Sequence, residues 1–167
     1  MTRILFVCLG NICRSPTAEG IVRARLHAAG LAEAVALDSC GTGRWHVGEP
    51  PDPRAQQEAR VRGIDIASLR ARQLRVDDFR AYDYLLAMDA DNLAHMRRMA
   101  PTDCQAHLGL LLDFAGQSGR SVPDPYYATE DGFAEVFALI EQAADGLIEH
   151  CRQHLATQRA ERGDAAR

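Results

Sequence analysis

A cysteine and an arginine near the start of the chain have the spacing of a nucleophile and an anion clamp. The segment from Val7 to Pro16 reads VCLGNICRSP, in which five residues separate Cys8 from Arg14. A thiolate is a strong nucleophile, and a guanidinium offers two parallel N–H donors to phosphate-like oxygens. The pair predicts transfer of a phosphoryl group to sulfur.

The residues around this pair predict a strand, a tight turn and a helix. Arg3–Val7 is a short apolar run typical of a buried strand, and residues 16–29 have helical spacing. Between them, Gly10 and Asn11 tolerate unusual backbone angles. The amide groups of such a turn point into one small space, which suits an anion.

The start of the helix supports the same chemistry. Ser15 suits the N-cap position and Pro16 the first helical position. The positive end of the helix favours the thiolate form of Cys8, and the Ser15 hydroxyl is placed to donate to its sulfur. We therefore predict a thiolate nucleophile in a ring of donors.

Other interpretations of this segment are weaker. A bare Cys-x5-Arg pair fits an inert buried cysteine and a surface charge, but the strand, turn and helix start all agree with the chemical interpretation. A nucleotide-binding glycine-rich loop ends in Gly-Lys-Ser or Gly-Lys-Thr, whereas this loop ends in Cys13-Arg14-Ser15. Cys8, Cys13 and Cys40 also lack the spacing of a zinc site.

A second chemical segment, Asp124-Pro125-Tyr126-Tyr127, follows the fourth predicted strand. A residue before proline is held in an extended conformation, and loops at the carboxyl ends of parallel strands gather over one crevice. Asp124 is then placed to protonate a leaving oxygen. The alternatives are a turn aspartate, and tyrosines that only pack against the last helix.

These segments resemble the low-molecular-weight protein tyrosine phosphatases. The matching stretches occur in the family's order and span nearly the whole chain. They are Val7–Glu19, Asp38–Gly43, Trp45–Gly48, Arg72–Gln73, Asp83–Met88 and Asp124–Tyr127.

The resemblance implies a fold and a set of roles. The fold is α/β, a four-stranded parallel sheet in the order two, one, three, four, with helices on both faces. Cys8, Arg14 and Asp124 are the expected catalytic residues, and Ser39 supports the loop together with Asn11. The expected phosphate- and substrate-binding residues are Leu9, Gly10, Asn11, Ile12, Cys13, Ser15, Trp45, Tyr126 and Tyr127.

The pattern of apolar residues and breakers predicts the remaining elements. We expect strands at 3–7, 34–39, 82–88 and 107–112, and helices at 16–29, at 53–62, from a cap at Asp89 to Pro101, and from Thr129 onward. One domain over 1–156 and a flexible tail over 157–167 follow, because the tail has no apolar pattern.

Composition narrows the class of protein further. The chain has 167 residues and a net charge of −4, which gives no reason to expect nucleic acid binding. No apolar run approaches a membrane span, and we expect no signal peptide before the first strand. Five cysteines in no disulfide pattern fit a reducing cytoplasm. We expect no cofactor, no metal, no membrane, and a monomer or weak dimer.

Four positions depart from the family pattern or leave a role open. Leu69 stands where family members often have a histidine, three residues before Arg72, so we expect no side-chain contact from it to the loop. Arg72 itself fits either a position near the cleft or a solvated face. Cys13 fits either packing or the family's protective disulfide with Cys8, and His46 receives no catalytic role.

The expected substrate is a tyrosine-phosphorylated protein, such as a bacterial tyrosine kinase, and three alternatives stand beside it. An arsenate reductase of this fold needs further cysteines near the third strand, and residues 83–100 contain none. A protein-arginine phosphatase tends to have threonine in place of Ile12 and phenylalanine in place of Tyr126. A non-catalytic phosphate-binding module would not need Cys8, Arg14 and Asp124 together.

Overall fold

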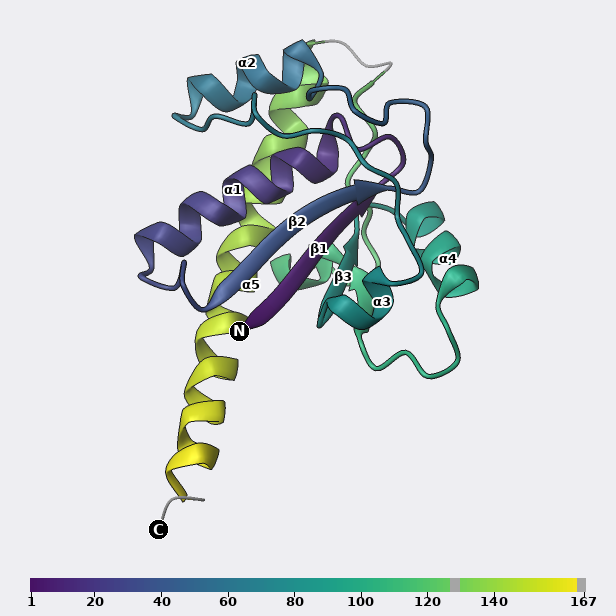
Figure 1. Cartoon of the computed structure of the whole chain (residues 1–167). Coiled ribbons are helices and arrows are strands. Elements are labelled where there is room, and N and C mark those ends of the chain that lie inside the picture. The colour runs from purple at the N-terminus through teal and green to yellow at the C-terminus, as the bar shows by residue number, and fades with distance from the viewer. Residues whose placement is uncertain (127–129, 165–167) are drawn as a thin grey trace.

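The fold is built on a parallel sheet, shown in Figure 1 by the computed structural model, which describes residues 1–126 and 130–164. The four strands of this sheet run in the order β2-β1-β3-β4, which confirms the predicted order. They are β1 (Thr2–Cys8), β2 (Val35–Gly41), β3 (Tyr84–Ala87) and β4 (His107–Leu110).

Helices cover both faces of the sheet, as the sequence predicted (Figure 1). Along β1, Ile4 and Phe6 pack into the cluster that includes α1, α2 and α5, whereas Leu5 and Val7 pack against α3 and α4. This alternation is the two-residue period of a strand that is buried on both faces. The helices are α1 (Arg14–Ala28), α2 (Pro53–Val61), α3 (Asp78–Ala81), α4 (Ala90–Met99) and α5 (Glu130–Asp164), with a 3₁₀ turn, η1, at Leu111–Ala115.

The carboxyl ends of the strands bring distant segments to one edge of the sheet. Cys8 ends β1 and Asp89 follows β3. The segment after η1 returns to the same edge, where the Val122 amide donates to the Met88 carbonyl at 2.7 Å. Cys8 and the loop that contains Asp124 are therefore held over one crevice, as expected for parallel α/β sheets.

The start of α1 differs from the prediction. The helix begins at Arg14, Cys13 precedes it, and no side chain caps it. The prediction that Ser15 is the N-cap is therefore wrong, because its hydroxyl is engaged elsewhere. The predicted caps of α2 and α4 are confirmed: Asp52 accepts from the Arg54 amide and Asp89 from the Asn92 amide, each at 2.8 Å.

Several element ends also differ from the sequence pattern. The strand predicted at 82–88 is limited to Tyr84–Ala87, and the one predicted at 107–112 turns into η1 after Leu110. Residues 157–164 are helical, where a flexible tail was expected, and this end of α5 projects beyond the sheet (Figure 1). The expected start of this helix at Thr129 lies outside the described residues.

Candidate active site

Cys8 lies at the end of β1 with its sulfur turned into a ring of donors. Its side chain is 3% exposed. The Asn11 amide donates to Cys8 Sγ at 3.2 Å, and Ser15 Oγ lies 3.0 Å from the same sulfur. The Asn11 amide therefore points at the sulfur, and the Ser15 hydroxyl is close enough to donate to it. We call residues 8–14 the phosphate loop.

Asn11 has the backbone conformation that the turn requires. Its φ of 57° is in the left-handed region, which asparagine adopts more readily than most residues. Its side-chain amide donates to Ser15 Oγ at 2.8 Å and to Ser39 Oγ at 3.0 Å. Since Ser15 and Ser39 accept from this one amide, they fix its orientation behind the phosphate loop.

The other side-chain atom of Asn11 is held by a segment that follows α2. Asn11 Oδ1 accepts from the Arg72 backbone amide at 3.0 Å. The family histidine is replaced by Leu69, and Leu69 packs against the hydrophobic core. The support from this segment therefore comes from its main chain and not from the side chain of residue 69.

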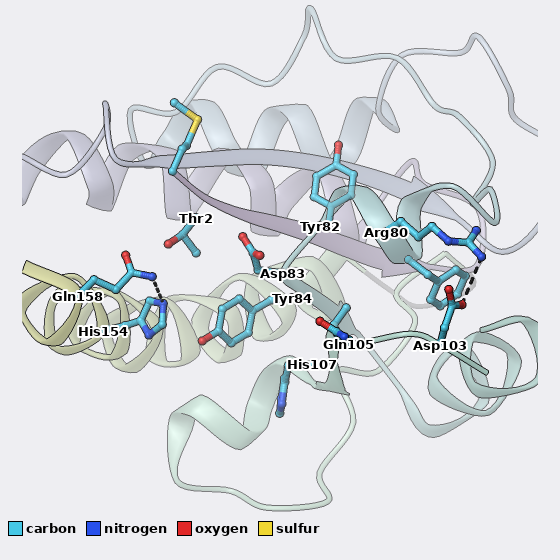
Figure 2. Close-up of a pocket in the computed structure, with 13 residues that line it drawn as sticks. Thr2, Arg80, Tyr82, Asp83, Tyr84, Asp103, Gln105, His107, His154 and Gln158 are labelled. Carbon is cyan, nitrogen blue, oxygen red and sulfur yellow. Dashed lines mark hydrogen bonds and ion pairs between the residues drawn. The ribbon is translucent and has the colours of Figure 1, made fainter. Parts of the chain in front are cut away.

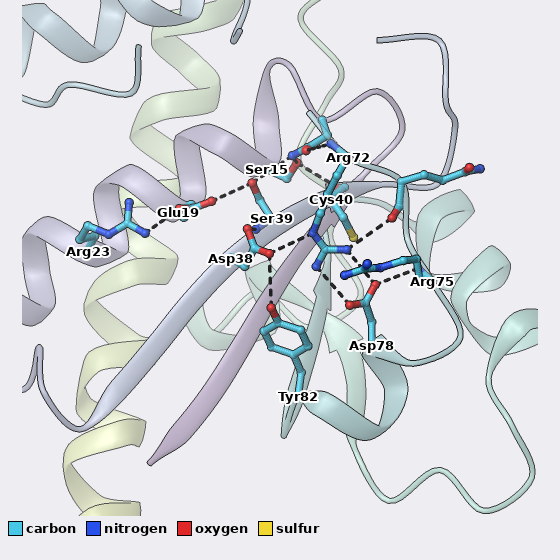
Figure 3. A network of polar contacts seen from close by, with 12 residues as sticks. Ser15, Glu19, Arg23, Asp38, Ser39, Cys40, Arg72, Arg75, Asp78 and Tyr82 are labelled. Atoms are coloured by element: carbon cyan, nitrogen blue, oxygen red, sulfur yellow. Dashed lines mark hydrogen bonds and ion pairs between the residues drawn. The ribbon is translucent and has the colours of Figure 1, made fainter. Parts of the chain in front are cut away.

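Arg72 is tied into a network of carboxylates and does not lie on a solvated face (Figure 3). Its guanidinium donates to Asp38 at 2.9 Å and to both oxygens of Asp78 at 3.0 and 3.1 Å. Burial opposes its charge, but the hydrogen bonds to Asp78 and the nearby carboxylates raise the pKa of Arg72 above its ordinary value. The network fixes the backbone amide that holds Asn11.

Figure 3 also shows Ser39, which accepts a hydrogen bond from the Asn11 side chain. Its hydroxyl donates to Glu19 Oε1 at 2.9 Å, and Glu19 is 3% exposed. The other Glu19 oxygen accepts from Arg23 at 2.6 Å. Ser39 thus lies between the Asn11 side chain and Glu19, and its role in supporting the loop stays a prediction.

The end of β2 supports the phosphate loop through backbone contacts. The Thr42 amide donates to the Cys8 carbonyl and the Gly43 amide to the Leu9 carbonyl, both at 2.9 Å. Gly41 approaches Leu9 so closely that a Cβ there would lie 2.7 Å from the Leu9 carbonyl oxygen. Only glycine fits at this position, because backbone atoms cannot move aside.

Arg14 is buried at the base of the site, with 2% of its side chain exposed. Its guanidinium donates to Asp89 Oδ2 at 2.6 Å, to the Val122 carbonyl at 3.1 Å, and to Asp124 Oδ2 at 3.4 Å. Burial opposes its charge, but Cys8 and the hydrogen bond to Asp89 raise the pKa of Arg14. These contacts fix a permanent cation beside Cys8.

Asp124 lies opposite the phosphate loop on the segment 122–126, which we call the acid loop. Its Oδ1 accepts from the Tyr126 amide at 3.0 Å, and its side chain is 39% exposed. The carboxylate is thus held close to Arg14 and remains open to solvent. A proton can be exchanged from this position.

A pocket of about 330 Å³ joins these residues. Asn11, Ser15 and Ser39 lie behind it, and the predicted contribution of Tyr127 lies outside the described residues. The residues that line the pocket are Cys8, Leu9, Gly10, Ile12, Cys13, Arg14, Trp45, His46, Asp124 and Tyr126.

Trp45 and His46 form the outer wall of the pocket. Trp45 is 70% exposed and covers Gly43, where a Cβ would overlap its ring. His46 was given no role from the sequence, but its ring lies over Gly10, its Nδ1 is 2.8 Å from Glu49, and its centroid is 6.0 Å from that of Tyr126. The aromatic walls suit a planar ring bound above Cys8.

Cys13 also lines this pocket and is a buried, free cysteine. Burial, together with the charge of Asp52, raises the pKa of the Cys13 thiol far above its ordinary value. Cys13 therefore remains a thiol under conditions in which a neighbouring thiolate would react. Its disulfide with Cys8 stays a prediction.

A second, separate hollow of about 640 Å³ lies at the opposite edge of the sheet (Figure 2). It is lined by the amino ends of β1, β3 and β4 and by α5, including Tyr84, His107 and His154.

Among residues 1–126 and 130–164, no group of three or more His, Cys, Asp or Glu side chains is arranged to hold a metal ion. None of the helices in the described part of the chain is long and apolar enough to cross a bilayer.

The model of the family described as low molecular weight phosphotyrosine protein phosphatase matches residues 3–160. The chain belongs to this family and is a hydrolase.

Individual relatives agree over most of their length. A low molecular weight phosphotyrosine protein phosphatase of Schizosaccharomyces pombe is 44% identical over 148 residues, which cover 87% of this chain and 94% of the relative. A protein tyrosine phosphatase of Entamoeba histolytica, crystallised with Hepes in its active site, superposes with a TM-score of 0.87 at 35% identity, covering 92% and 99% of the two chains. A Drosophila arginine phosphatase has a TM-score of 0.84 at 31% identity, covering 90% and 97%.

Proposed function

We propose that the chain hydrolyses phosphotyrosine in proteins through a phosphocysteine intermediate on Cys8. One observation carries the proposal: the Cys8 sulfur, within 3.2 Å of two donors, lies in a pocket that Arg14 and Asp124 also line. Nucleophile, cation and proton donor are the three groups that transfer of a phosphoryl group to sulfur requires.

The first step forms the intermediate. A phosphomonoester dianion enters the phosphate loop, where the loop amides and Arg14 bind its oxygens. The Cys8 thiolate attacks phosphorus in line, and the bond from phosphorus to the phenolic oxygen breaks. Asp124, protonated at this stage, gives its proton to the leaving oxygen.

The second step releases phosphate. Asp124, now a carboxylate, takes a proton from water as the water oxygen attacks phosphorus. The phosphorus–sulfur bond breaks, and the Cys8 thiolate returns to the donors from Asn11 and Ser15. Arg14 and the amides neutralise the equatorial oxygens in both steps, so the scheme uses no metal.

The pocket walls favour an aromatic phosphate ester. Trp45 and Tyr126 stand at the mouth of the pocket, and Ile12 is at its wall. A phosphotyrosine ring places its phosphorus deep enough to reach Cys8 while it contacts these side chains, whereas phosphoserine is shorter and lacks a ring. The substrate would be a tyrosine-phosphorylated protein in the cytoplasm.

A direct test compares phosphotyrosine, phosphoserine and phosphoarginine in one peptide sequence, assayed with a chelator. We expect kcat/KM to be highest for phosphotyrosine and Cys8→Ser to abolish turnover. Preference for phosphoarginine would instead assign the chain the activity named for its Drosophila neighbour. Substantial turnover by Cys8→Ser would contradict the nucleophile itself.

A further inference from the structure

The amino end of α2 lies against the phosphate loop. The Asp52 amide donates to the Ile12 carbonyl at 2.8 Å, and the Asp52 carboxylate caps the helix through the Arg54 amide. Asp52 is 9% exposed. The first turn of α2 is therefore fixed in position relative to the loop that holds the nucleophile.

The Arg54 side chain folds back onto the same cap. Its Nε donates to Asp52 Oδ1 at 3.1 Å and its Nη2 to Asp52 Oδ2 at 2.9 Å, which is a bidentate pair. Burial raises the pKa of Asp52, but the hydrogen bonds from Arg54 outweigh it and leave that pKa below its ordinary value. Both partners are therefore charged near neutral pH.

The same guanidinium reaches the acid loop. Arg54 Nη2 donates to the Tyr126 carbonyl at 3.0 Å, and the guanidinium carbon lies 5.8 Å from the centre of the Tyr126 ring. It also lies 4.7 Å from the centre of the Phe133 ring on α5. Arg54 thus joins the start of α2, the acid loop and α5 in one set of contacts.

Tyr126 orients Asp124 together with Arg14. Its amide donates to Asp124 Oδ1 at 3.0 Å, and its carbonyl accepts from Arg54. Pro123 and Pro125 have no N–H, so they cannot fix this segment by donating hydrogen bonds. A tether on the Tyr126 carbonyl therefore acts on the carboxylate through a short, direct connection.

We propose that Arg54 is a positioning residue that holds the acid loop so that Asp124 can transfer its proton. Arg54 touches no reacting atom and acts through Tyr126. The inference rests on the proposed function, because it requires Asp124 to be the general acid.

A purely structural role for Arg54 would have a different signature, and the chain offers a matched control. At the other end of α2, Arg62 pairs with Glu58 and Glu141 and lies 5.0 Å from the centre of the Phe137 ring. This is the same chemistry, a guanidinium over an α5 aromatic ring with carboxylate partners, but without a contact to the acid loop.

The experiment measures kcat/KM of Arg54→Ala, Arg54→Lys, Arg62→Ala and Asp124→Ala on two aryl phosphates. Para-nitrophenol leaves without help from an acid, whereas phenol needs a proton. A reacting group displaced by about 1 Å can cost about 10²-fold in rate. We expect Arg54→Ala to lose about 10–100-fold on phenyl phosphate and far less on para-nitrophenyl phosphate.

The controls separate positioning from folding. Arg62→Ala should lower kcat/KM only slightly, and equally for both substrates. Arg54→Lys keeps the charge but loses the planar fork, so its kcat/KM on phenyl phosphate should lie between those of wild type and Arg54→Ala. Adding Arg54→Ala to Asp124→Ala should cause no further loss on phenyl phosphate, because the two changes affect one proton transfer. A thermal unfolding curve of each variant verifies that it is folded.

Two outcomes overturn different statements. If Asp124→Ala loses activity selectively on phenyl phosphate but Arg54→Ala lowers kcat/KM equally for both substrates, the positioning proposal is wrong and the proposed function stands. If Asp124→Ala itself shows no selectivity between the two substrates, the general acid is misassigned, and the proposal for Arg54 fails with it.

Discussion

Ser15 is the residue whose removal tests the donor ring around the nucleophile. Its hydroxyl is buried and lies 3.0 Å from Cys8 Sγ, while it accepts from Asn11 Nδ2 at 2.8 Å. With Asn11 donating to it, the hydroxyl has a single proton to give, for which the Cys8 sulfur at 3.0 Å and the Cys40 carbonyl at 3.3 Å compete. Ser15→Ala removes this donor and leaves the amide of Asn11 as the other contact to the sulfur.

The size of the effect follows from the strength of one charge-assisted hydrogen bond. Such bonds contribute about 1.5–3 kcal/mol. Because 1.36 kcal/mol corresponds to a factor of ten, the reactivity of the Cys8 sulfur should fall by about one to two decades. In the proposed mechanism the loss acts on both chemical steps, since the same thiolate is the attacking group in the first and the leaving group in the second.

Alkylation by iodoacetamide reports the thiolate directly. We expect the alkylation rate of the Cys8 peptide, measured at one neutral pH, to fall by about 10–100-fold in Ser15→Ala. Ser39→Ala is the matched control, because it removes a hydroxyl 3.0 Å from Asn11 that does not contact the sulfur. Equal alkylation rates for Ser15→Ala and wild type, or an equal fall in Ser39→Ala, would refute the reasoning.

Two further predictions concern stability. Arg72→Met leaves the buried Asp78 carboxylate without its main partner and should lower the free energy of unfolding in urea by about 3 kcal/mol; an equal loss in Arg75→Met, at an exposed position, would contradict this. Burial and two neighbouring histidines lower the pKa of His150, so the folded state resists its protonation. The unfolded state therefore binds the proton first, and the free energy of unfolding should fall as the pH drops below about 6.5. The melting temperature of His150→Gln should fall less on acidification than that of wild type, whereas His27→Gln, at an exposed position, should behave like wild type.

The phosphate loop and the sheet could be predicted because local signals agreed. An apolar run before Cys8, a residue tolerant of positive φ at Asn11 and helical spacing after Arg14 each indicated the same strand-to-helix turn. Asp124 before a proline indicated an extended loop, and the rule that loops gather at the carboxyl edge brought it to the same crevice. These features depend on short stretches of sequence.

The errors have particular physical causes. Ser15 has the chemistry of an N-cap, but its hydroxyl is used by Asn11 and lies against Cys8, so the helix begins earlier without a side-chain cap. Residues 157–164 lack an apolar stripe and were expected to be irregular. They contain alanine, glutamine, glutamate and arginine, whose intrinsic helix propensity is high enough to continue a long existing helix.

Contacts between segments that are distant in the sequence could not be predicted. Arg54 and Tyr126 are 72 positions apart, and Asn11 and Arg72 are 61 apart, so no local spacing connects them. His46 follows the only tryptophan on a loop rich in glycine and proline, and nothing in that loop indicates which side chain faces the pocket. Such contacts depend on the tertiary fold.

The central claim is a covalent bond between phosphorus and one sulfur, and trapping that bond tests it most directly. The chain is mixed with an aryl phosphate, denatured within milliseconds, digested and analysed by mass spectrometry. We predict phosphate on the peptide that contains Cys8, accumulating to a higher level in Asp124→Ala because that variant lacks the base that activates water. Turnover with no trapped phosphoenzyme, or phosphate bound at another residue, would contradict the account.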